Sequence, residues 1–199
     1  MLEGLNRHLF LLLNAPAHPD SLILGFALVV ARYIVFIVPL YLLLGWLLSG
    51  TDESKKRVLR AALSSAVALL LAQGLAAAFP HARPFVLGLG TNFLQHLPNA
   101  SFPSDHATLM LAAAFSLMFS ATTRIFGIAL FTLGVLVAWS RVYLGVHYPL
   151  DMAGALFAGL CGALLVAWMP GPIFNRMYGI TLALYRAVFS PLIRRGWLG

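Results

Sequence analysis

Three short polar clusters stand out in a chain that is otherwise mostly apolar. The first contains Arg83 and Pro84, the second reads Pro-Ser-Asp-His at residues 103–106, and the third reads SRVYLGVHYPLD at residues 140–151. Together they hold two arginines, two histidines, carboxylates and hydroxyl groups. Arginine presents a planar, permanently charged fork that matches the oxygens of a phosphate. A histidine followed by a carboxylate is typical of an oriented nucleophile or base. The residue types therefore predict phosphoryl-transfer chemistry.

Three of these residues are candidates for the chemical steps. Pro149 predicts the start of a helix, so Asp151 falls in the first helical turn, four residues after His147. There the carboxylate can orient one ring nitrogen of His147 and free the other to attack phosphorus. His106 can donate a proton to the leaving oxygen. We therefore predict that His147, Asp151 and His106 are catalytic.

The candidates for phosphate binding are Arg83, Ser104, Asp105, Arg141 and Arg32. Ser104 opens a helix whose free amides and dipole suit an anion, although Ser104 and Asp105 also read as an ordinary N-cap. Arg141 can equally anchor at a membrane interface. Asp105 either keeps the neighbouring histidine protonated or only benefits from the helix dipole. Arg32 lies within an apolar segment, where an arginine costs about 2.5–3.5 kcal/mol; it either snorkels or has a polar partner.

The elements that must position these residues are membrane helices. Of 199 residues, 61% are hydrophobic and 10% are charged, with a mean hydropathy of +0.90, whereas soluble domains carry about 25% charged residues. Five segments reach the length of about 17–25 residues that spans a bilayer: residues 21–48, 58–79, 104–123, 125–143 and 150–169. The sequence predicts one all-α integral membrane domain over residues 1–199, with a tilt or a kink in the long first span, which contains Arg32 and Pro39.

Two further segments predict helices that do not cross the membrane. Residues 2–13 are too short to span and are expected to be interfacial or re-entrant; if they cross, the bundle has six spans. Residues 172–195 mix arginines with aromatic residues, as in an interfacial amphipathic helix. Cys161 is the only cysteine, so neither an internal disulfide nor a zinc site is expected. No carboxylate cluster suggests magnesium, and we expect no metal cofactor.

The basic residues predict the orientation. Alternating spans place all three polar clusters at one end of the bundle, together with the N-terminus. That end carries three basic residues outside the spans, and the opposite end carries nine: Lys55, Lys56, Arg57, Arg60, Arg124, Arg176, Arg186, Arg194 and Arg195. The positive-inside rule makes the nine-residue end cytoplasmic. The net charge of +7 thus reflects topology, and no nucleic-acid partner is expected.

The clusters resemble the three signatures of the type 2 phosphatidic acid phosphatase family, which is related to the vanadium haloperoxidases. These are Lys-x6-Arg-Pro, Pro-Ser-Gly-His and Ser-Arg-x5-His-x3-Asp. The third match is complete, the second has Asp105 in place of glycine, and the first has Ala76 in place of lysine. Over the catalytic segment, residues 79–152, the chain looks most like bacterial undecaprenyl-diphosphate phosphatases of the bacitracin-resistance type.

This resemblance implies a metal-independent reaction through a phosphohistidine on His147. Asp151 would orient the His147 ring, and His106 would be the acid that protonates the leaving group. The implied substrate is a polyprenyl diphosphate. The implied reaction converts undecaprenyl diphosphate to the monophosphate at the outer face of the bacterial plasma membrane, which recycles the cell-wall lipid carrier and lowers bacitracin sensitivity. Arg32 is expected to replace the cation missing at Ala76 and to contact the second phosphate.

Other functions remain open within the same chemistry. One is a phosphatase for phosphatidylglycerol phosphate or another lipid phosphate, and another is a lipid phosphotransferase. A transporter is disfavoured, because its charged residues would be distributed through the membrane depth, whereas these cluster at one face.

Overall fold

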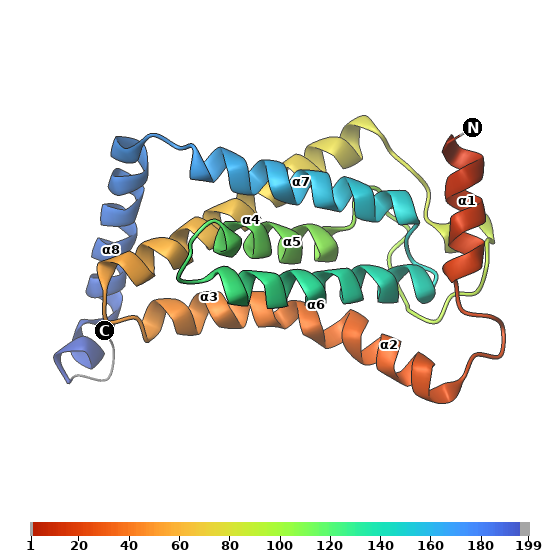
Figure 1. The fold of residues 1–199 in the computed structure, drawn as a ribbon, viewed down its shortest axis with the longest axis horizontal. Coiled ribbons are helices and arrows are strands. Elements are labelled where there is room, and N and C mark those ends of the chain that lie inside the picture. Colours follow the sequence, from red (N-terminus) through yellow and green to blue (C-terminus); the bar gives the residue numbers. More distant parts are fainter. Residues whose placement is uncertain (1, 196–199) are drawn as a thin grey trace.

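The computed structural model describes residues 2–195, and every regular element in this part of the chain is helical. In chain order the elements are α1 (Leu2–Leu13), α2 (Ser21–Tyr33), the 3₁₀ helix η1 (Ile34–Phe36), α3 (Ile37–Leu47), α4 (Asp52–Ala78), the 3₁₀ helix η2 (Pro84–Leu87), α5 (Asp105–Met118), α6 (Arg124–Tyr143), α7 (Pro149–Ala167) and α8 (Gly171–Arg194). Helices α2 to α7 run along the long axis of the molecule, and α1 and α8 lie across its two ends (Figure 1).

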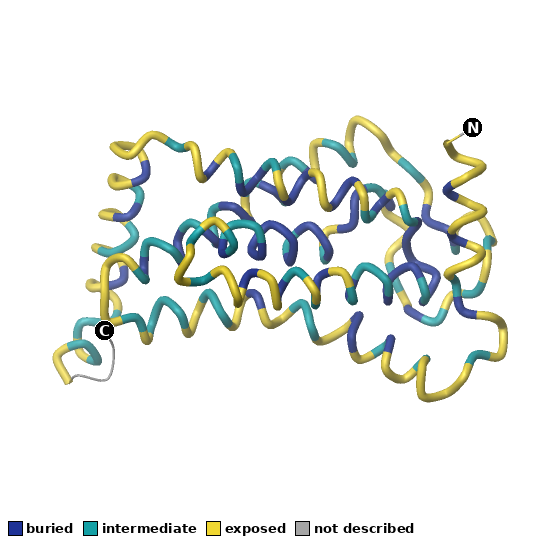
Figure 2. Tube along the Cα trace, in the orientation of Figure 1, coloured by how far each residue is buried: buried dark blue, intermediate teal, exposed yellow. Residues whose placement is uncertain are grey.

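Within residues 2–195, four helical stretches are long and apolar enough to cross a membrane: Ser21–Leu47, Asp52–Ala78, Arg124–Tyr143 and Pro149–Ala167. Their outer faces carry large exposed apolar side chains, including Leu22 at 81% exposure and Leu70 at 72%. Figure 2 shows that burial is concentrated inside the bundle. Exposed apolar surface on this scale requires lipid around it. The chain is therefore a multi-pass membrane protein, as predicted.

The third predicted span is shorter than expected. Helix α5 ends at Met118 instead of residue 123 and has 14 residues, which is about 21 Å at 1.5 Å per residue, against about 30 Å for a bilayer core. The polar run from Ser120 to Thr123 forms a turn, and the Thr123 hydroxyl donates to the Leu117 carbonyl over 2.8 Å. Because α5 packs against α4, α6 and α7, it is shielded from lipid and need not match the bilayer.

The first span is broken where the sequence predicts a kink. The 3₁₀ turn at Ile34–Phe36 separates α2 from α3 just before Pro39. Proline has no N–H to donate to the carbonyl four residues earlier, which here belongs to Val35, so the helix is weakened at this point. At the start of this span, Asp20 caps α2 by accepting from the amides of Leu22 and Ile23.

A close seam between α4 and α7 holds the bundle around α5. A Cβ atom placed on Gly162 of α7 would lie 2.7 Å from the Cβ of Ala68 on α4, so only glycine allows this approach. Small residues commonly let membrane helices pack backbone to backbone. The seam fixes α7, and with it the carboxylate of Asp151 at the N-terminal end of the helix.

Helix α1 lies across the same end of the bundle as the three polar clusters (Figure 1). Its Asn6 accepts from the Leu150 amide over 3.1 Å, and its Phe10 packs edge-to-face on Tyr148. Asn14 follows the helix and donates to the carbonyls of Thr91 and Tyr143, each over 2.9 Å. With 12 residues, α1 is too short to span, as predicted, and it braces the loops that carry the clusters.

Helix α8 covers the opposite end (Figure 1). Tyr178 donates to Asp52 over 2.9 Å, and the guanidinium of Arg60 lies 3.9 Å from the ring centre of Phe174. The predicted amphipathic helix therefore docks its aromatic face on the start of α4. Its position across the bundle end fits an interfacial helix.

Candidate functional site

The turn between α6 and α7 presents His147. Gly145 has φ +83° and a Cβ there would lie 2.1 Å from the carbonyl oxygen of Thr91, so the turn requires glycine. Pro149 starts α7, and the carboxylate of Asp151 accepts from the Tyr148 amide over 2.8 Å. This cap holds Asp151 at the N-terminal end of α7, directly beside His147.

The predicted pairing of His147 with Asp151 is present. His147 Nδ1 lies 3.1 Å from Asp151 Oδ2, and both residues are buried at 1% exposure. The other ring nitrogen, Nε2, lies 3.0 Å from Nη1 of Arg83. A guanidinium can only donate, so Nε2 carries the lone pair and Nδ1 carries the proton that goes to Asp151. This is the tautomer that a nucleophilic Nε2 requires.

The charge state of His147 agrees with this tautomer. Burial lowers the pKa of His147 to about 4, and the positive charges of Arg141 and Arg83 act in the same direction, although the bond with Asp151 opposes the shift. The ring is therefore neutral at neutral pH, with the lone pair of Nε2 directed at Arg83.

Ser101 is a member of the site that the sequence reasoning missed. Its hydroxyl donates to Oδ2 of Asp151 and lies 3.5 Å from Nδ1 of His147. The carboxylate oxygen thus accepts from the Ser101 hydroxyl, the His147 ring and the Tyr148 amide. Ser101 precedes the Pro-Ser-Asp-His cluster and matches none of the signatures, so only the folded loop reveals its role.

Arg83 connects the loop before α5 to the turn before α7. Its Nε donates to Asn99 over 3.0 Å, Nη2 donates to the Ala100 carbonyl over 3.1 Å, and Nη1 donates to the Val146 carbonyl over 2.9 Å. The side chain is 3% exposed. Arg83 therefore reaches Nε2 of His147, but most of its donors are used to hold the walls of the site.

Arg141 and Ser104 have buried polar atoms without partners. Among the described residues, Nε and Nη2 of Arg141 and Oγ of Ser104 accept or donate no hydrogen bond. A buried charged donor without an acceptor costs several kcal/mol, and a bound anion could supply the missing acceptors. Ser104 is also the N-cap of α5, without a side-chain capping bond, and the first amides of that helix lack helical acceptors.

His106 is half-buried and has no hydrogen-bond partner within residues 2–195. It is electrostatically coupled to Arg141 and His147 and also to His96, so it shares their site. Only the protonated ring can act as an acid, and a phosphate bound beside it would favour that form. The carboxylate of Asp105 lies near Arg83, Arg141 and His96, but its hydrogen bond is accepted from Gln73 of α4 over 3.0 Å.

Arg32 is the one predicted site residue that the structure does not bring to the others. Its side chain is exposed near the end of α2, which packs mainly against α6. Ala76 lies on α4, where its small side chain lines a cavity of about 290 Å³ together with Gln73 and Asn99. The expectation that Arg32 replaces the missing lysine across a helix interface is corrected accordingly, since α2, the part of the span that carries Arg32, packs mainly against α6, and it is α3 that packs against α4.

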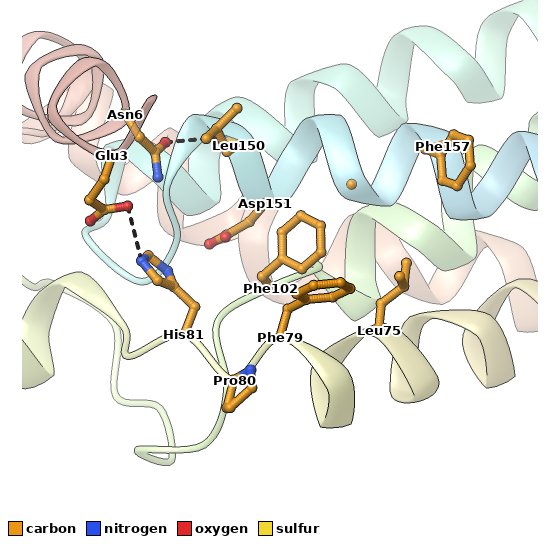
Figure 3. A pocket seen from close by; sticks show the side chains of 11 residues that line it. Glu3, Asn6, Leu75, Phe79, Pro80, His81, Phe102, Leu150, Asp151 and Phe157 are labelled. Atoms are coloured by element: carbon orange, nitrogen blue, oxygen red, sulfur yellow. Dashed lines mark hydrogen bonds and ion pairs between the residues drawn. The ribbon is translucent and has the colours of Figure 1, made fainter. Parts of the chain in front are cut away.

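An apolar cavity of about 610 Å³ lies beside the buried carboxylate. Figure 3 shows Leu75, Phe79, Phe102 and Phe157 along its length, with Asp151 at its edge. At its outer end, polar residues of α1 close the cavity, where Glu3 of that helix lies 3.2 Å from His81. A hollow with apolar walls and a polar end fits a lipid chain better than a water-soluble ligand.

Comparison with known proteins agrees with this geometry. A family model described as the PAP2 superfamily matches residues 57–174, which contain most of α4, the whole of α5 to α7 and all three polar clusters. The chain belongs to the PAP2 superfamily. This membership confirms the predicted resemblance. Among residues 2–195, no three or more His, Cys, Asp or Glu side chains are grouped so that they could hold a metal ion.

Two full-length relatives are informative. The chain is 39% identical over 199 residues to YbjG of Escherichia coli (strain K12), provisionally named an undecaprenyl-diphosphatase, covering 100% of this chain and 99% of that protein. It is 27% identical over 191 residues to the undecaprenyl-diphosphatase BcrC of Bacillus subtilis (strain 168), covering 96% and 97% of the two chains.

One solved structure supports the PAP2 fold. It is the first transmembrane PAP2 type phosphatidylglycerolphosphate phosphatase from Bacillus subtilis, with a TM-score of 0.64 and 20% identity, covering 83% of this chain and 84% of that one. This likeness shows the shared all-helical membrane fold.

Proposed function

We propose that this PAP2 protein removes the terminal phosphate of undecaprenyl diphosphate and leaves undecaprenyl phosphate. The observation that carries the proposal is the set of buried, unpartnered donors of Arg141 and Ser104 beside a neutral His147 that is oriented by Asp151. These groups suit a phosphate that is attacked by a nitrogen. The names of BcrC and YbjG support a polyprenyl diphosphate as the substrate, and the neighbouring apolar cavity supports a lipid.

The first step transfers the terminal phosphoryl group to the protein. Nε2 of His147 attacks the terminal phosphorus, a P–N bond forms, and the bond from phosphorus to the bridging oxygen breaks. The electron pair goes to the bridging oxygen, which takes a proton from the imidazolium of His106 and leaves with the lipid, so that the His106 ring becomes neutral. Asp151 stabilises the positive charge that develops on the imidazole, while Arg141, Arg83 and Ser104 bind the transferred oxygens.

The second step returns the protein to its starting state. Water attacks phosphorus on the side that the lipid phosphate has left, and its proton passes to His106. The P–N bond breaks, its electron pair returns to Nε2, and inorganic phosphate is released. His106 therefore serves first as an acid and then as a base, as microscopic reversibility requires. No step uses a metal ion.

The site is proposed to face the outside of a bacterial plasma membrane. The three-to-nine asymmetry of basic residues between the two ends supports this orientation. At that face the reaction would recycle the cell-wall lipid carrier and reduce the amount of diphosphate available to bacitracin.

The orientation can be tested with single cysteines after Cys161 is replaced by alanine. Gln95 is exposed in the loop beside the site, and Glu53 is exposed at the opposite end with a side-chain exposure of 72%. In intact spheroplasts a membrane-impermeant thiol reagent should label Gln95→Cys, and it should label Glu53→Cys only after lysis. The reverse pattern would place the chemistry in the cytoplasm and reject the recycling role.

The activity is tested by phosphate release from undecaprenyl diphosphate, undecaprenyl phosphate and phosphatidylglycerol phosphate, each with EDTA. We expect the highest kcat/KM for the diphosphate, no effect of EDTA, and no activity in His147→Ala. A preference for phosphatidylglycerol phosphate would reject the proposed substrate, and appearance of the phosphate on a second lipid would indicate a phosphotransferase.

A further inference from the structure

His96 stands beside the proposed nucleophile but belongs to none of the family signatures. It lies on the loop before α5, and its ring meets that of His147 edge-to-face with the centroids 6.2 Å apart. The side chain is half-buried. His106 is electrostatically coupled to both of these rings. His96 therefore lies at the rim of the site, near the nucleophile and the proposed acid.

The ring of His96 has one committed nitrogen and one free nitrogen. Nδ1 lies 3.1 Å from the carbonyl oxygen of Leu97, and because a carbonyl can only accept, Nδ1 carries a proton and donates it. Within residues 2–195, Nε2 has no hydrogen-bond partner. This bond fixes the direction of the ring and leaves Nε2 as the atom available to a ligand.

A diphosphate requires a contact that a monophosphate does not. When the terminal phosphate is transferred, the other phosphate leaves with the lipid and carries the negative charge that develops on the bridging oxygen. Most donors of Arg83 are engaged with the walls of the site, and its remaining donor, with those of Arg141 and Ser104, is assigned above to the transferred group. Arg32 is remote, and position 76 is an alanine. A further donor is therefore needed at the rim.

We propose that His96 binds the second phosphate of a diphosphate substrate through Nε2 and thereby favours diphosphates over monophosphates. The proposal rests on the function proposed above and names the group that recognises its substrate. His106 protonates the bridging oxygen, whereas His96 contacts a non-bridging oxygen of the phosphate that departs with the lipid.

The contact depends on the protonation of His96. Its pKa is lowered by burial and by the charges of Arg83 and Arg141, while the Leu97 carbonyl and Asp105 oppose this shift; His106 and His147 are the other titratable groups facing it. A phosphate at Nε2 favours the protonated ring and makes the bond charge-assisted. Binding of a diphosphate therefore takes up a proton, and its KM rises with pH as His96 loses that proton.

The test compares one prenyl chain carrying either one or two phosphates, for example farnesyl phosphate and farnesyl diphosphate. Hydrogen bonds to charged groups contribute about 1.5–3 kcal/mol, which corresponds to roughly 10- to 100-fold. At 1.4 kcal/mol per factor of ten, we expect His96→Ala to lower kcat/KM on the diphosphate by roughly 10- to 100-fold. On the monophosphate, kcat/KM should fall by less than about threefold.

Two further variants complete the experiment. His96→Gln keeps a donor at similar reach and should restore part of the activity on the diphosphate, with a KM that no longer varies with pH. Gln95→Ala, at the exposed neighbouring position, should match wild type on both substrates. Thermal unfolding of each variant in detergent verifies folding.

The outcomes separate the two proposals. If wild type releases no phosphate from the diphosphate, the proposed function fails and the inference fails with it. If wild type cleaves the diphosphate but His96→Ala loses activity equally on both substrates, or on neither, the proposed function stands and His96 does not recognise the second phosphate.

Discussion

Nη1 of Arg83 lies 3.0 Å from Nε2 of His147, so the nitrogen proposed to attack phosphorus faces a permanent positive charge. This contact has two consequences. It keeps the imidazole neutral with its lone pair on Nε2, and it directs an approaching phosphate to the same nitrogen. Because Arg83 is itself held by the carbonyls of Ala100 and Val146, the geometry of the nucleophile depends on both loops at this end of the bundle.

Arg141 should show a trade-off between stability and activity. Its Nε and Nη2 are buried without partners, and replacing buried charges with apolar groups of similar volume often stabilises by about 1–4 kcal/mol. We expect Arg141→Met to raise the unfolding temperature in detergent and to lower kcat/KM more than about 100-fold. Orthovanadate, a phosphate mimic, should raise the unfolding temperature of wild type but not of Arg141→Met.

The matched control for that variant is Arg60→Met at the other end of the bundle. Arg60 stacks on Phe174 and donates to the Val166 carbonyl. This substitution should lower the unfolding temperature and leave activity and the vanadate response intact. If Arg141→Met is less stable than wild type, the unpartnered atoms do not mark an anion site.

Ser101 should act as a positioning residue through Asp151. Removal of its hydroxyl leaves the carboxylate with one donor fewer, and a hydrogen bond to a charged group contributes about 1.5–3 kcal/mol. We expect Ser101→Ala to lower kcat roughly tenfold or more with little change in KM, and Ser101→Thr to recover part of it. Ser65→Ala, which removes a buried hydroxyl bonded to the Ala61 carbonyl, is the control. An increase in KM alone would contradict the role.

The lowered pKa of His147 predicts how stability depends on pH. In the unfolded chain a histidine has a pKa of about 6.5, and in the folded protein burial lowers it to about 4. The unfolded state therefore binds more protons between these values, so this residue stabilises the fold above about pH 6.5, and the contribution is lost as the pH falls toward 4. We expect His147→Gln to flatten the fall in unfolding temperature over this range; an unchanged slope would show that other groups cause it.

Asp105 should not control the protonation of His106. Although adjacent in sequence, the carboxylate of Asp105 is bonded to Gln73 of α4. We expect Asp105→Asn to leave the alkaline limb of the pH–rate profile in place, and Gln73→Ala to behave in the same way. A shift of that limb in Asp105→Asn alone would restore the interpretation that Asp105 tunes the acid.

Much of this arrangement follows from the sequence, because local spacing determines it. The interval of four residues between His147 and Asp151, with Pro149 between them, is enough to place a carboxylate beside the ring. Apolar length and basic residues likewise predict which loops share an end. Helix α5 is shorter than predicted. Its apolar composition does not distinguish a helix surrounded by lipid, which must match the bilayer thickness, from one surrounded by other helices.

The remaining residues of the site depend on tertiary contacts. Ser101 and His96 lie in a loop whose path is set by Arg83 and by the docking of α1, neither of which leaves a local pattern. The expectation for Arg32 assumed that its own part of the first span packs against α4, whereas α2 packs mainly against α6 and it is α3 that packs against α4. Sequence spacing predicts neighbours along one helix but not which helices meet.

The most direct test is to follow the terminal phosphate of undecaprenyl diphosphate onto the protein. Substrate radiolabelled in that phosphate is mixed with wild type, His106→Ala and His147→Ala, quenched in alkali within one turnover, and digested for peptide mapping. The account predicts label on the peptide that contains His147 in wild type, slower appearance of the same label in His106→Ala, and none in His147→Ala. Phosphate release with no labelled protein, or label on a peptide that lacks His147, would contradict it.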